Sequence, residues 1–180
     1  MVRPSTSTAA LGANRTLLIV KYATFEQLTK EELGGSAIHA SNGSIDNLAA
    51  SEADAFAQIV AFLSYLPSSV SLLPPSLPIS DPPTRASEEL LSIIPRKRIR
   101  TYDVRRLIEL VVDEGSWFEI GRTWGKSIVV GFARLGGRSV GVISQDCKEK
   151  GGTLDARSAQ KVRRHIDLWC VHSFSPRLTR

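Results

Sequence analysis

Residues 95–144 read PRKRIRTYDVRRLIELVVDEGSWFEIGRTWGKSIVVGFARLGGRSVGVIS, and this stretch carries the strongest structural signals of the chain. Asp103 is a favourable helix N-cap, and apolar residues follow it at helical spacing, namely Val104, Leu107, Ile108 and Val111. Beyond them, two apolar runs over 127–135 and 139–144 flank the pair Gly136-Gly137. The stretch therefore predicts a helix that begins after Asp103 and, further on, a β-hairpin.

The hairpin is followed by a polar loop over 145–153 and by a pattern that predicts a further helix over 155–169. Apolar residues recur in it at helical spacing, which predicts one buried side. The members of that side are Ala159, Val162, Ile166 and Trp169. The basic residues Arg157, Lys161 and Arg164 are expected to form another side of the same helix.

The segment before this region is rich in proline. Six of the nine prolines lie between Pro67 and Pro83. Because proline fixes φ and removes a backbone donor, we predict a linker without helix or central strand over 67–87. Upstream, an amphipathic helix is predicted over 52–66, since Ser51 and Asp54 resemble a capping pair. Its apolar residues at helical spacing are Phe56, Ile59, Val60 and Leu63.

Signals closer to the N-terminus are weaker. Residues 17–21 predict a short strand, and residues 1–16 are expected to be disordered. Thr29 and Glu32 predict a single capped helical turn, which the pair Gly34-Gly35 should interrupt.

The composition bounds the class of protein. The chain has 180 residues, enough for one ordinary domain or two small, incomplete ones. Its 42% hydrophobic and 23% charged residues are typical of a folded globular chain. No apolar run reaches the roughly 18 to 20 residues of a membrane span, so no membrane is expected as a partner. Cys147 and Cys170 are too isolated to indicate a disulfide framework or a zinc site.

The formal net charge of +5 is distributed unevenly. Residues 1–75 hold four Lys or Arg against six Asp or Glu, whereas residues 76–180 hold nineteen against twelve. The densest cluster is RKRIR, residues 96–100. A solvated or ion-paired loop, a contact with a CoA-type phosphate and a contact with nucleic acid stay open, in that order, because no nucleic-acid-binding signature accompanies the cluster.

Side-chain catalysis needs a nucleophile, a base and an orienting group within reach of one another, and the sequence offers no such set. His39, His165 and His172 are scattered, and we interpret them as surface or structural residues. The pairs Gly34-Gly35 and Gly151-Gly152 are interpreted first as turns and second as places where backbone amides approach an anionic ligand. No catalytic side chain and no metal ligand are assigned.

Four motifs then occur in a fixed order. They are Tyr102-Asp103-Val104-Arg105, the D-x-x-S-W-x-E segment from Asp113 to Glu119, the run from Gly131 to Ile143, and Gly151-Gly152-Thr153-Leu154-Asp155 followed by Ser158, Ala159 and Lys161. Together they resemble the carboxyltransferase (beta) subunit of biotin-dependent acyl-CoA carboxylases, of the propionyl-CoA or methylcrotonyl-CoA carboxylase type. The resemblance runs from about residue 17 to about residue 168.

The resemblance implies a crotonase-like α/β fold made of two related ββα-spiral halves. Residues 17–66 would then be the end of the N-terminal subdomain, 67–87 the linker, 88–170 the start of the C-terminal subdomain and 171–180 a divergent tail. It also implies carboxyl transfer from carboxybiotin to the α-carbon of an acyl-CoA. In the family, backbone amides in two oxyanion holes stabilise the developing charges, which would explain the absence of a side-chain catalyst.

The same resemblance implies partners. These are a biotin carboxylase or biotin-carrier subunit, which presents biotin as carboxybiotin, and further carboxyltransferase subunits in a homo-oligomer, with acyl-CoA as the other substrate. Nucleic acid is not expected. A basic, Ser/Thr-rich start leaves both the mitochondrial matrix and the cytoplasm open as the compartment.

Two family segments have no counterpart in the sequence. One is the Gly-rich oxyanion loop expected before residue 17, and the other is the P-G-[FY]-x-x-G loop expected after the last helix. We therefore expect a truncated carboxyltransferase that is weakly active or inactive, so whether the chain is an enzyme stays open; the alternative is a non-catalytic assembly module. The residues expected to line a substrate- or biotin-binding site are Gly34, Gly35, Gly151, Gly152, Ser158 and Lys161.

Overall fold

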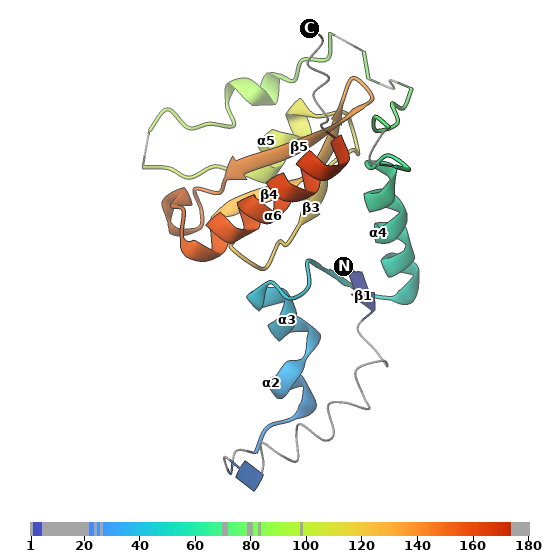
Figure 1. The fold of residues 1–180 in the computed structure, drawn as a ribbon. Helices are drawn as coiled ribbons and strands as arrows, with labels where there is room; N and C mark the ends of the chain where they lie inside the picture. The colour runs from blue at the N-terminus through green and yellow to red at the C-terminus, as the bar shows by residue number, and fades with distance from the viewer. Residues whose placement is uncertain are drawn as a thin grey trace, which may run out of the picture. The chain divides into compact units, whose positions relative to one another are not determined.

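A computed structural model describes residues 2–4, 22–23, 25, 27–69, 72–78, 81–82, 84–97 and 99–173. Their contacts group the chain into two compact units, Met1–Ile59 and Val60–Arg180 (Figure 1). The division falls inside helix α4 (Glu52–Ser64). The strand predicted over 17–21 and most of the tail over 171–180 lie outside the described residues.

Among its described residues, the first unit contains two short parallel strands and the short helices α2 and α3. Strand β1 (Val2–Pro4) pairs with β2 (Asn47–Ala49), and α2 (Lys30–Gly34) and α3 (Ser36–Asn42) lie between them in the sequence. The prediction of a start disordered over 1–16 is therefore wrong for Val2–Pro4, because this segment forms backbone hydrogen bonds along β2. The remainder of 1–16 lies outside the described residues.

The capped turn predicted at Thr29 is confirmed as the start of α2. The Thr29 amide donates to the Glu32 carboxylate at 2.8 Å, and the Glu32 amide donates back to the Thr29 hydroxyl at 3.3 Å. This exchange satisfies two amides that have no partner within the helix. It also lowers the pKa of Glu32 below its ordinary value, chiefly through the hydrogen bond from the Thr29 amide.

Helix α4 confirms the helix predicted over 52–66. The Asp54 amide donates to Ser51 Oγ at 3.2 Å, and the Ala50 amide donates to Asp54 Oδ2 at 2.8 Å, so the proposed capping pair exists. The apolar side expected for this helix is largely exposed. Its exposed members are Phe56, Ile59, Val60 and Leu63.

The second unit is built on an antiparallel sheet of order β3-β4-β5. Its strands are β3 (Phe118–Ile120), β4 (Ile128–Leu135) and β5 (Arg138–Gln145). The hairpin predicted from Gly136-Gly137 is confirmed, since β4 and β5 pair from Ile128↔Gln145 to Leu135↔Arg138. Gly136 and Gly137 have φ values of 58° and 76°, the positive values that a tight two-residue hairpin turn requires.

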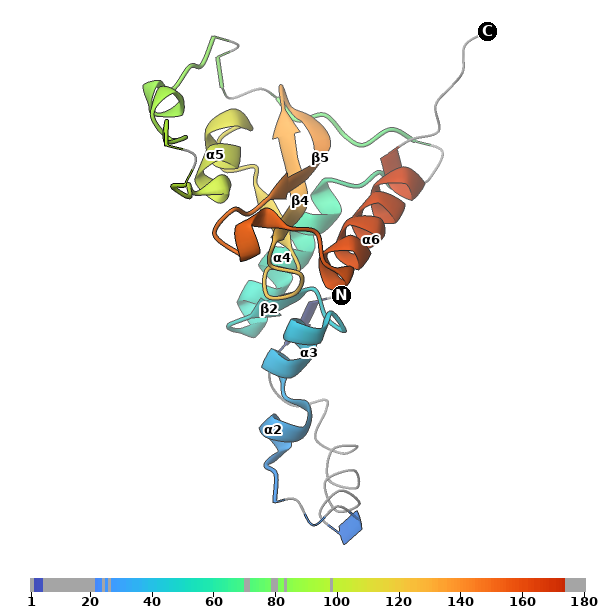
Figure 2. The same cartoon turned by 90° about the vertical axis from the view of Figure 1, so that its left-hand side faces the viewer.

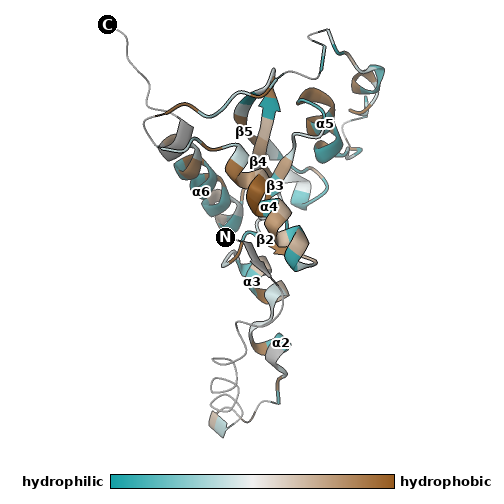
Figure 3. Ribbon diagram, turned by 90° about the vertical axis from the view of Figure 1, so that its right-hand side faces the viewer, coloured by the Kyte–Doolittle hydropathy of each residue, from teal (hydrophilic) through white to brown (hydrophobic). Residues whose placement is uncertain are grey.

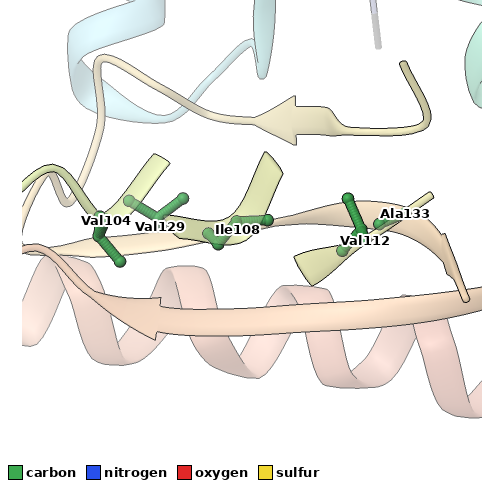
Figure 4. Close-up of a cluster of buried hydrophobic side chains, with 5 residues drawn as sticks. All are labelled: Val104, Ile108, Val112, Val129 and Ala133. Carbon is green, nitrogen blue, oxygen red and sulfur yellow. The ribbon is translucent and has the colours of Figure 1, made fainter. Parts of the chain in front are cut away.

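Helices cover both faces of this sheet. Helix α5 (Val104–Val111) packs on one face, and α6 (Ala156–Ser173) packs on the other, as Figure 2 shows. The core on the α5 side consists of Val104, Ile108, Val112, Val129 and Ala133 (Figure 4). Because β4 is covered from both sides, its side chains are buried from Ile128 to Arg134, which explains why its sequence is continuously apolar instead of alternating.

The N-cap predicted at Asp103 is confirmed, because its side chain accepts hydrogen bonds from the amides of Arg105 and Arg106. One member of the predicted apolar stripe is wrong. Val111 is exposed, and Val112 takes its place in the core. The reason is that the helix ends at Val111, after which Val112 adopts an extended conformation.

The buried side of α6 differs from the prediction. Over 156–170, where the side chains of this helix are described, the buried residues are Ser158, Lys161 and His165, whereas Ala159 is exposed and Ile166 is 44% exposed. Val162 and Trp169 are half-buried, as expected for the apolar side, and Trp169 packs on Phe132. Figure 3 accordingly shows hydrophilic colours along much of α6 and hydrophobic colours along α4. Lys161 is not part of an exposed basic side, because its ammonium is hydrogen-bonded in the interior.

The described residues of the proline-rich segment contain neither helix nor strand up to the short 3₁₀ helix η1 (Glu88–Leu91), as predicted. The segment nevertheless contacts the sheet unit. The Leu77 amide donates to the Gly137 carbonyl at 3.0 Å, and the Glu114 amide donates to Asp81 at 2.9 Å. Arg85 pairs with Asp81 and donates to the carbonyl of Val112. In the part of the chain that the structure describes, no helix is long and apolar enough to cross a membrane.

Candidate functional site

Four of the six predicted site residues lie in the second unit, at or before the start of α6. Asp155 is placed just before the helix, where its Oδ1 accepts a hydrogen bond from the Ser158 amide at 2.9 Å. Ser158 Oγ in turn accepts from the Asp155 amide at 2.8 Å. Each residue thus satisfies the backbone donor of the other, as in a capping box. Ser158 is fully buried, and its hydroxyl is used within the helix cap.

An ionised aspartate lies at this helix start. The pKa of Asp155 is held well below its ordinary value, first by the hydrogen bond from the Ser158 amide and then by that from Lys150. The Lys150 Nζ lies 3.0 Å from Asp155 Oδ2. An ionised carboxylate already interacts with the positive end of the helix dipole here. The cap therefore occupies the position that an external anion would use.

Gly151 and Gly152 form the short 3₁₀ helix η2 (Lys150–Gly152) and have φ values of 66° and 74°. Their left-handed conformation favours glycine in both places. Gly152 is buried, and a Cβ there would lie 3.3 Å from the Cβ of Gln145. Gly151 is exposed, and nothing lies within 4 Å of the position that a Cβ would take. The turn interpretation is confirmed, and the backbone of Gly151 faces open space.

Lys161 is 3% exposed, and its Nζ donates to the carbonyl of Ile128 at 2.7 Å. The loop over 121–127 lies against this part of α6. A Cβ on Gly121 would be 3.4 Å from Lys161 Cε, and a Cβ on Gly125 would be 3.0 Å from Ser158 Cα. Ser158 and Lys161 therefore anchor the connection between β3 and β4 to the first turns of α6.

Gly34 and Gly35 belong to the first unit, where Gly35 separates α2 from α3. Gly35 is buried in an ordinary extended conformation, and a Cβ there would collide with the side chain and backbone of Glu31. The interruption of the helix predicted at this pair is confirmed. The structure thus gathers Gly151, Gly152, Ser158 and Lys161 in one unit, and describes the other glycine pair separately.

An ionic cluster that the sequence did not single out connects three parts of the second unit. Arg105 on α5 makes three hydrogen bonds to the carboxylate of Glu119 on β3: its Nε donates to Oε1 at 3.1 Å and to Oε2 at 2.8 Å, and its Nη2 donates to Oε1 at 2.7 Å. Its Nη1 donates to Asp146, just after β5, at 2.6 Å. These carboxylates raise the pKa of Arg105, chiefly through the hydrogen bonds to Glu119. The side chain of Asp146 is 3% exposed, so the pair is well shielded from water.

A polar pocket of about 410 Å³ lies beside this cluster. Its lining residues are Asp103, Arg105, Arg106, Glu109, Trp117, Glu119 and Arg122. Its principal charges are paired within the protein, since Arg106 contacts Glu89 at 2.7 Å and Arg122 contacts Glu119 at 3.8 Å. A ligand in this pocket would therefore meet charged side chains that are already ion-paired within the protein.

Asp113 closes the hairpin turn. Its two carboxylate oxygens accept hydrogen bonds from the amides of Gly136 and Gly137 at 2.9 and 2.7 Å. Ser116 Oγ donates to the Asp113 carbonyl at 2.6 Å and accepts from the Arg134 amide at 3.0 Å. The segment from Asp113 to Glu119 thus attaches the end of α5 both to the turn and, through Glu119, back to the helix start.

Comparison with known proteins identifies this arrangement. The model of the carboxyl transferase domain matches residues 14–174. The chain belongs to the carboxyl transferase domain family. It is 37% identical over 149 residues to the carboxyltransferase subunit of propionyl-CoA carboxylase from Haloferax mediterranei, covering 82% of this chain and 29% of that protein. It is 36% identical over 149 residues to the mitochondrial propionyl-CoA carboxylase beta chain of Homo sapiens, covering 82% and 28%.

The fold comparison agrees. A crystal structure of transcarboxylase 12S, with methylmalonyl-CoA and methylmalonic acid bound, matches with a TM-score of 0.80 and 28% identity over 87% of this chain and 30% of that one. The resemblance drawn from the sequence is confirmed, as is a mixed α/β carboxyltransferase structure. The chain spans about 29% of the length of the first of these curated relatives.

In the structure, charged residues of the family motifs contact other motifs. Arg105 and Glu119, which come from two different motifs, bind each other, and Asp113 binds the glycines of the third. The pairing could have been inferred from the joint occurrence of an arginine and a glutamate in motifs that frame one helix and one strand. Asp146 carried no such signal, because it lies in the polar loop, 41 residues from Arg105.

The remaining side chains that could take part in chemistry have the following surroundings. Arg134 is 6% exposed, donates to the Ser64 carbonyl at 2.9 Å and lies 4.6 Å above the ring of Tyr65. His39 is exposed, and the side chain of His172 lies outside the described residues. Among the described residues, no group of three or more His, Cys, Asp or Glu is arranged to hold a metal ion. Arg96, Lys97 and Arg100 of the basic cluster are exposed, and the three interpretations of this cluster stay open.

Proposed function

We propose that this chain is the carboxyltransferase component of a biotin-dependent acyl-CoA carboxylase and contributes to carboxyl transfer from carboxybiotin to the α-carbon of an acyl-CoA. The observation that carries the proposal is the match of the carboxyl transferase domain over residues 14–174. The acyl-CoA class is supported by relatives named propionyl-CoA carboxylase. The finer fold proposed is crotonase-like, with two ββα-spiral halves.

The proposed role of the described residues is to build a scaffold. Support comes from the family motifs, whose charged side chains are bound to one another: Arg105 to Glu119, and Asp113 to the hairpin turn. Catalysis in such a scaffold would depend on backbone amides, which stabilise an oxyanion only where they are held in place before the reaction. We propose that the chain by itself transfers carboxyl groups weakly or not at all.

Gly151 is the best candidate for direct substrate contact among the predicted site residues. Gly152 continues the same turn, Ser158 and Lys161 lie in the helix that follows, and Gly34 and Gly35 are a second candidate segment. The proposal is supported by the open space around Gly151 and by its left-handed backbone. Gly136 offers a matched control, because it has a φ of 58° and equally open surroundings. Both alanine variants carry the same backbone strain.

The site experiment compares Gly151→Ala with Gly136→Ala in the full chain. We expect Gly151→Ala to weaken the binding of propionyl-CoA or of biotin, measured by calorimetry, at least threefold more than Gly136→Ala. Equal binding by the two variants would assign Gly151 to the turn alone. Thermal unfolding of each variant controls for a general loss of structure.

The function is tested by incubating the purified chain with carboxybiotin and propionyl-CoA, with and without a biotin-carrying subunit. Transfer that depends on the acyl-CoA and is blocked by avidin supports the transferase, at a low rate for the chain alone. Co-purification with the biotin-carrying subunit but no transfer supports the alternative, a non-catalytic assembly module. Robust transfer by the chain alone contradicts the proposed weakness, and neither transfer nor association contradicts both functions.

The proposed partners are a biotin carboxylase or biotin-carrier subunit and further copies of carboxyltransferase subunits. Support for the second comes from transcarboxylase 12S, whose structure is described as a hexamer assembly. The proposed compartment is the mitochondrial matrix or the cytoplasm. Relatives from Sus scrofa and Homo sapiens are named as mitochondrial, whereas another comes from the bacterium Roseobacter denitrificans.

A further inference from the structure

His165 is an unusual buried side chain on α6. It is 4% exposed, and neither ring nitrogen has a hydrogen-bond partner among the residues that the structure describes. Its ring lies 5.2 Å from the ring of Phe132 on β4. On the neighbouring strand β5, a Cβ on Gly141 would be only 3.3 Å from His165 Nε2, so the space around the imidazole is tightly filled.

A neutral imidazole carries one N–H donor and one acceptor nitrogen, and both lose their contacts with water in this position. A buried donor or acceptor without a partner costs free energy. The protonated ring would carry two donors and a charge, which makes its burial more costly still. Burial lowers the pKa of His165 to about 4, and the nearby charge of Lys161 adds to the effect.

The surrounding charges do not compensate for protonation. On α6 the neighbouring charge is the Lys161 ammonium, and on β4 the charged residue that shares the face of Phe132 is Arg134. The face of β5 that carries Gly141 also carries Ser139 and Ile143, and neither is ionisable. Among these described neighbours there is no carboxylate to stabilise an imidazolium, and the Lys161 ammonium opposes its charge.

The two helices that cover the sheet differ in this respect. The α5 side has an apolar core that includes Ile108, and no histidine belongs to this cluster in the described part of the chain. The α6 side places His165 between Lys161 and Trp169, one turn from each, against Phe132. Protonation of one residue would therefore act on one helix.

We propose that His165 makes the packing of α6 against β4 and β5 sensitive to acid, so that protonation of its imidazole releases α6 while α5 stays packed. The proposal is independent of the function proposed above. It assigns the chain a conformational switch whose trigger is a single buried side chain.

The direction follows from linkage. The pKa of this imidazole is lower in the packed state than its ordinary value of about 6.5. The neutral ring therefore contributes its full preference for the packed state above about pH 6.5. This preference is lost progressively as the pH falls from about 6.5 to about 4. In that window the equilibrium constant for release rises up to roughly tenfold per pH unit, or about 30-fold between pH 7.5 and pH 5.

The experiment follows amide hydrogen exchange of α5 and α6 in the full chain at pH 7.5 and pH 5, corrected for the intrinsic pH dependence of exchange. We expect the protection of α6 to fall about 30-fold and that of α5 to change little. In His165→Phe, which fills the site with an apolar ring of similar size, the selective loss in α6 should disappear. His39→Gln, which changes an exposed histidine, should behave like the wild type.

Three results would overturn the proposal. These are equal loss of protection in α5 and α6, the same selective loss in His165→Phe as in the wild type, and a His165 pKa near 6.5 in an NMR titration of the wild-type chain. The titration needs no substitution, so it decides the matter even if His165→Phe does not fold.

Discussion

The two faces of the sheet in the second unit are buried by different means. On the α5 side, aliphatic residues such as Val104, Ile108 and Val129 fill the interior, and the charged residues lie at its edge. On the α6 side, the helix buries Ser158, Lys161 and His165 against the same central strand. The central strand β4 therefore has an apolar interface with α5 on one face and a polar interface with α6 on the other.

The difference matters because the two interfaces respond to different changes. An apolar interface tolerates swaps that conserve volume, since dispersion and burial are not directional. A polar interface depends on individual partners, because a buried group left without one retains its full desolvation cost. Besides its buried polar side chains, the α6 side contains an aromatic group, which is formed by Phe132, Tyr65, Phe62 and Trp169.

The largest effect is expected from this aromatic group. Phe132→Ala removes a fully buried ring that contacts three other aromatic rings and His165, and it should lower the free energy of unfolding by about 4 kcal/mol. Ile108→Val on the α5 side should cost about 1 kcal/mol. Denaturant unfolding followed by tryptophan fluorescence measures both, because Trp117, Trp124 and Trp169 all lie in the second unit. A larger loss for Ile108→Val would reverse the ranking of the two faces.

The next effect tests the edge of the α5 side. Arg105→Met removes the closest cation from Glu119 and from the shielded carboxylate of Asp146, which should cost about 3 kcal/mol. The matched control is Arg122→Met, because Arg122 is largely exposed and contacts Glu119 only at 3.8 Å. The control should change stability by less than about 0.5 kcal/mol. Similar losses for both arginines would mean that shielding from water does not set the strength of the cluster.

The α5 side was largely predictable from the sequence. A capping aspartate followed by an apolar stripe predicts a helix of known phase, and Gly136-Gly137 between two apolar runs fixes the hairpin. These signals are local, because the capping residue or turn lies next to the element that it defines. Only the end of the helix was misjudged, since Val112 enters the core after the helical pattern stops.

The α6 side was not predictable in the same way. Hydrophobic periodicity assigned Ile166 to the interior and Lys161 to the surface, and the structure reverses both. The burial of Lys161 depends on the carbonyl of Ile128, 33 residues away, and no local pattern reports such a partner. The candidate site shares this limit: its residues were located at the helix start, but the hydrogen bonds that occupy Ser158 and Lys161 were not foreseen.

A third prediction concerns that buried ammonium. Lys161→Met keeps the length of the side chain but leaves the carbonyl of Ile128 without its buried donor, which should cost about 2 kcal/mol. Lys126→Met is the control, since Lys126 is exposed in the loop that Lys161 anchors. If both substitutions leave the unfolding midpoint unchanged, the α6 side does not depend on its polar partners and the contrast between the faces fails.

The prediction with the smallest expected effect compares Ser158, at the end of the polar interface, with Lys161 at its centre. Ser158→Ala removes a hydroxyl that binds Asp155, but the Ser158 amide still donates to the Asp155 carboxylate at 2.9 Å. The loss should therefore be about 1 kcal/mol, smaller than for Lys161→Met, measured by the same unfolding experiment. Ser92→Ala, which removes an exposed hydroxyl bound to the carbonyl of Glu89, should change stability by less than about 0.5 kcal/mol. A different outcome is that Ser158→Ala lowers the free energy of unfolding as much as Lys161→Met does. The critical polar contact would then lie at the helix cap, because the remaining bond from the Ser158 amide would not replace the lost hydroxyl.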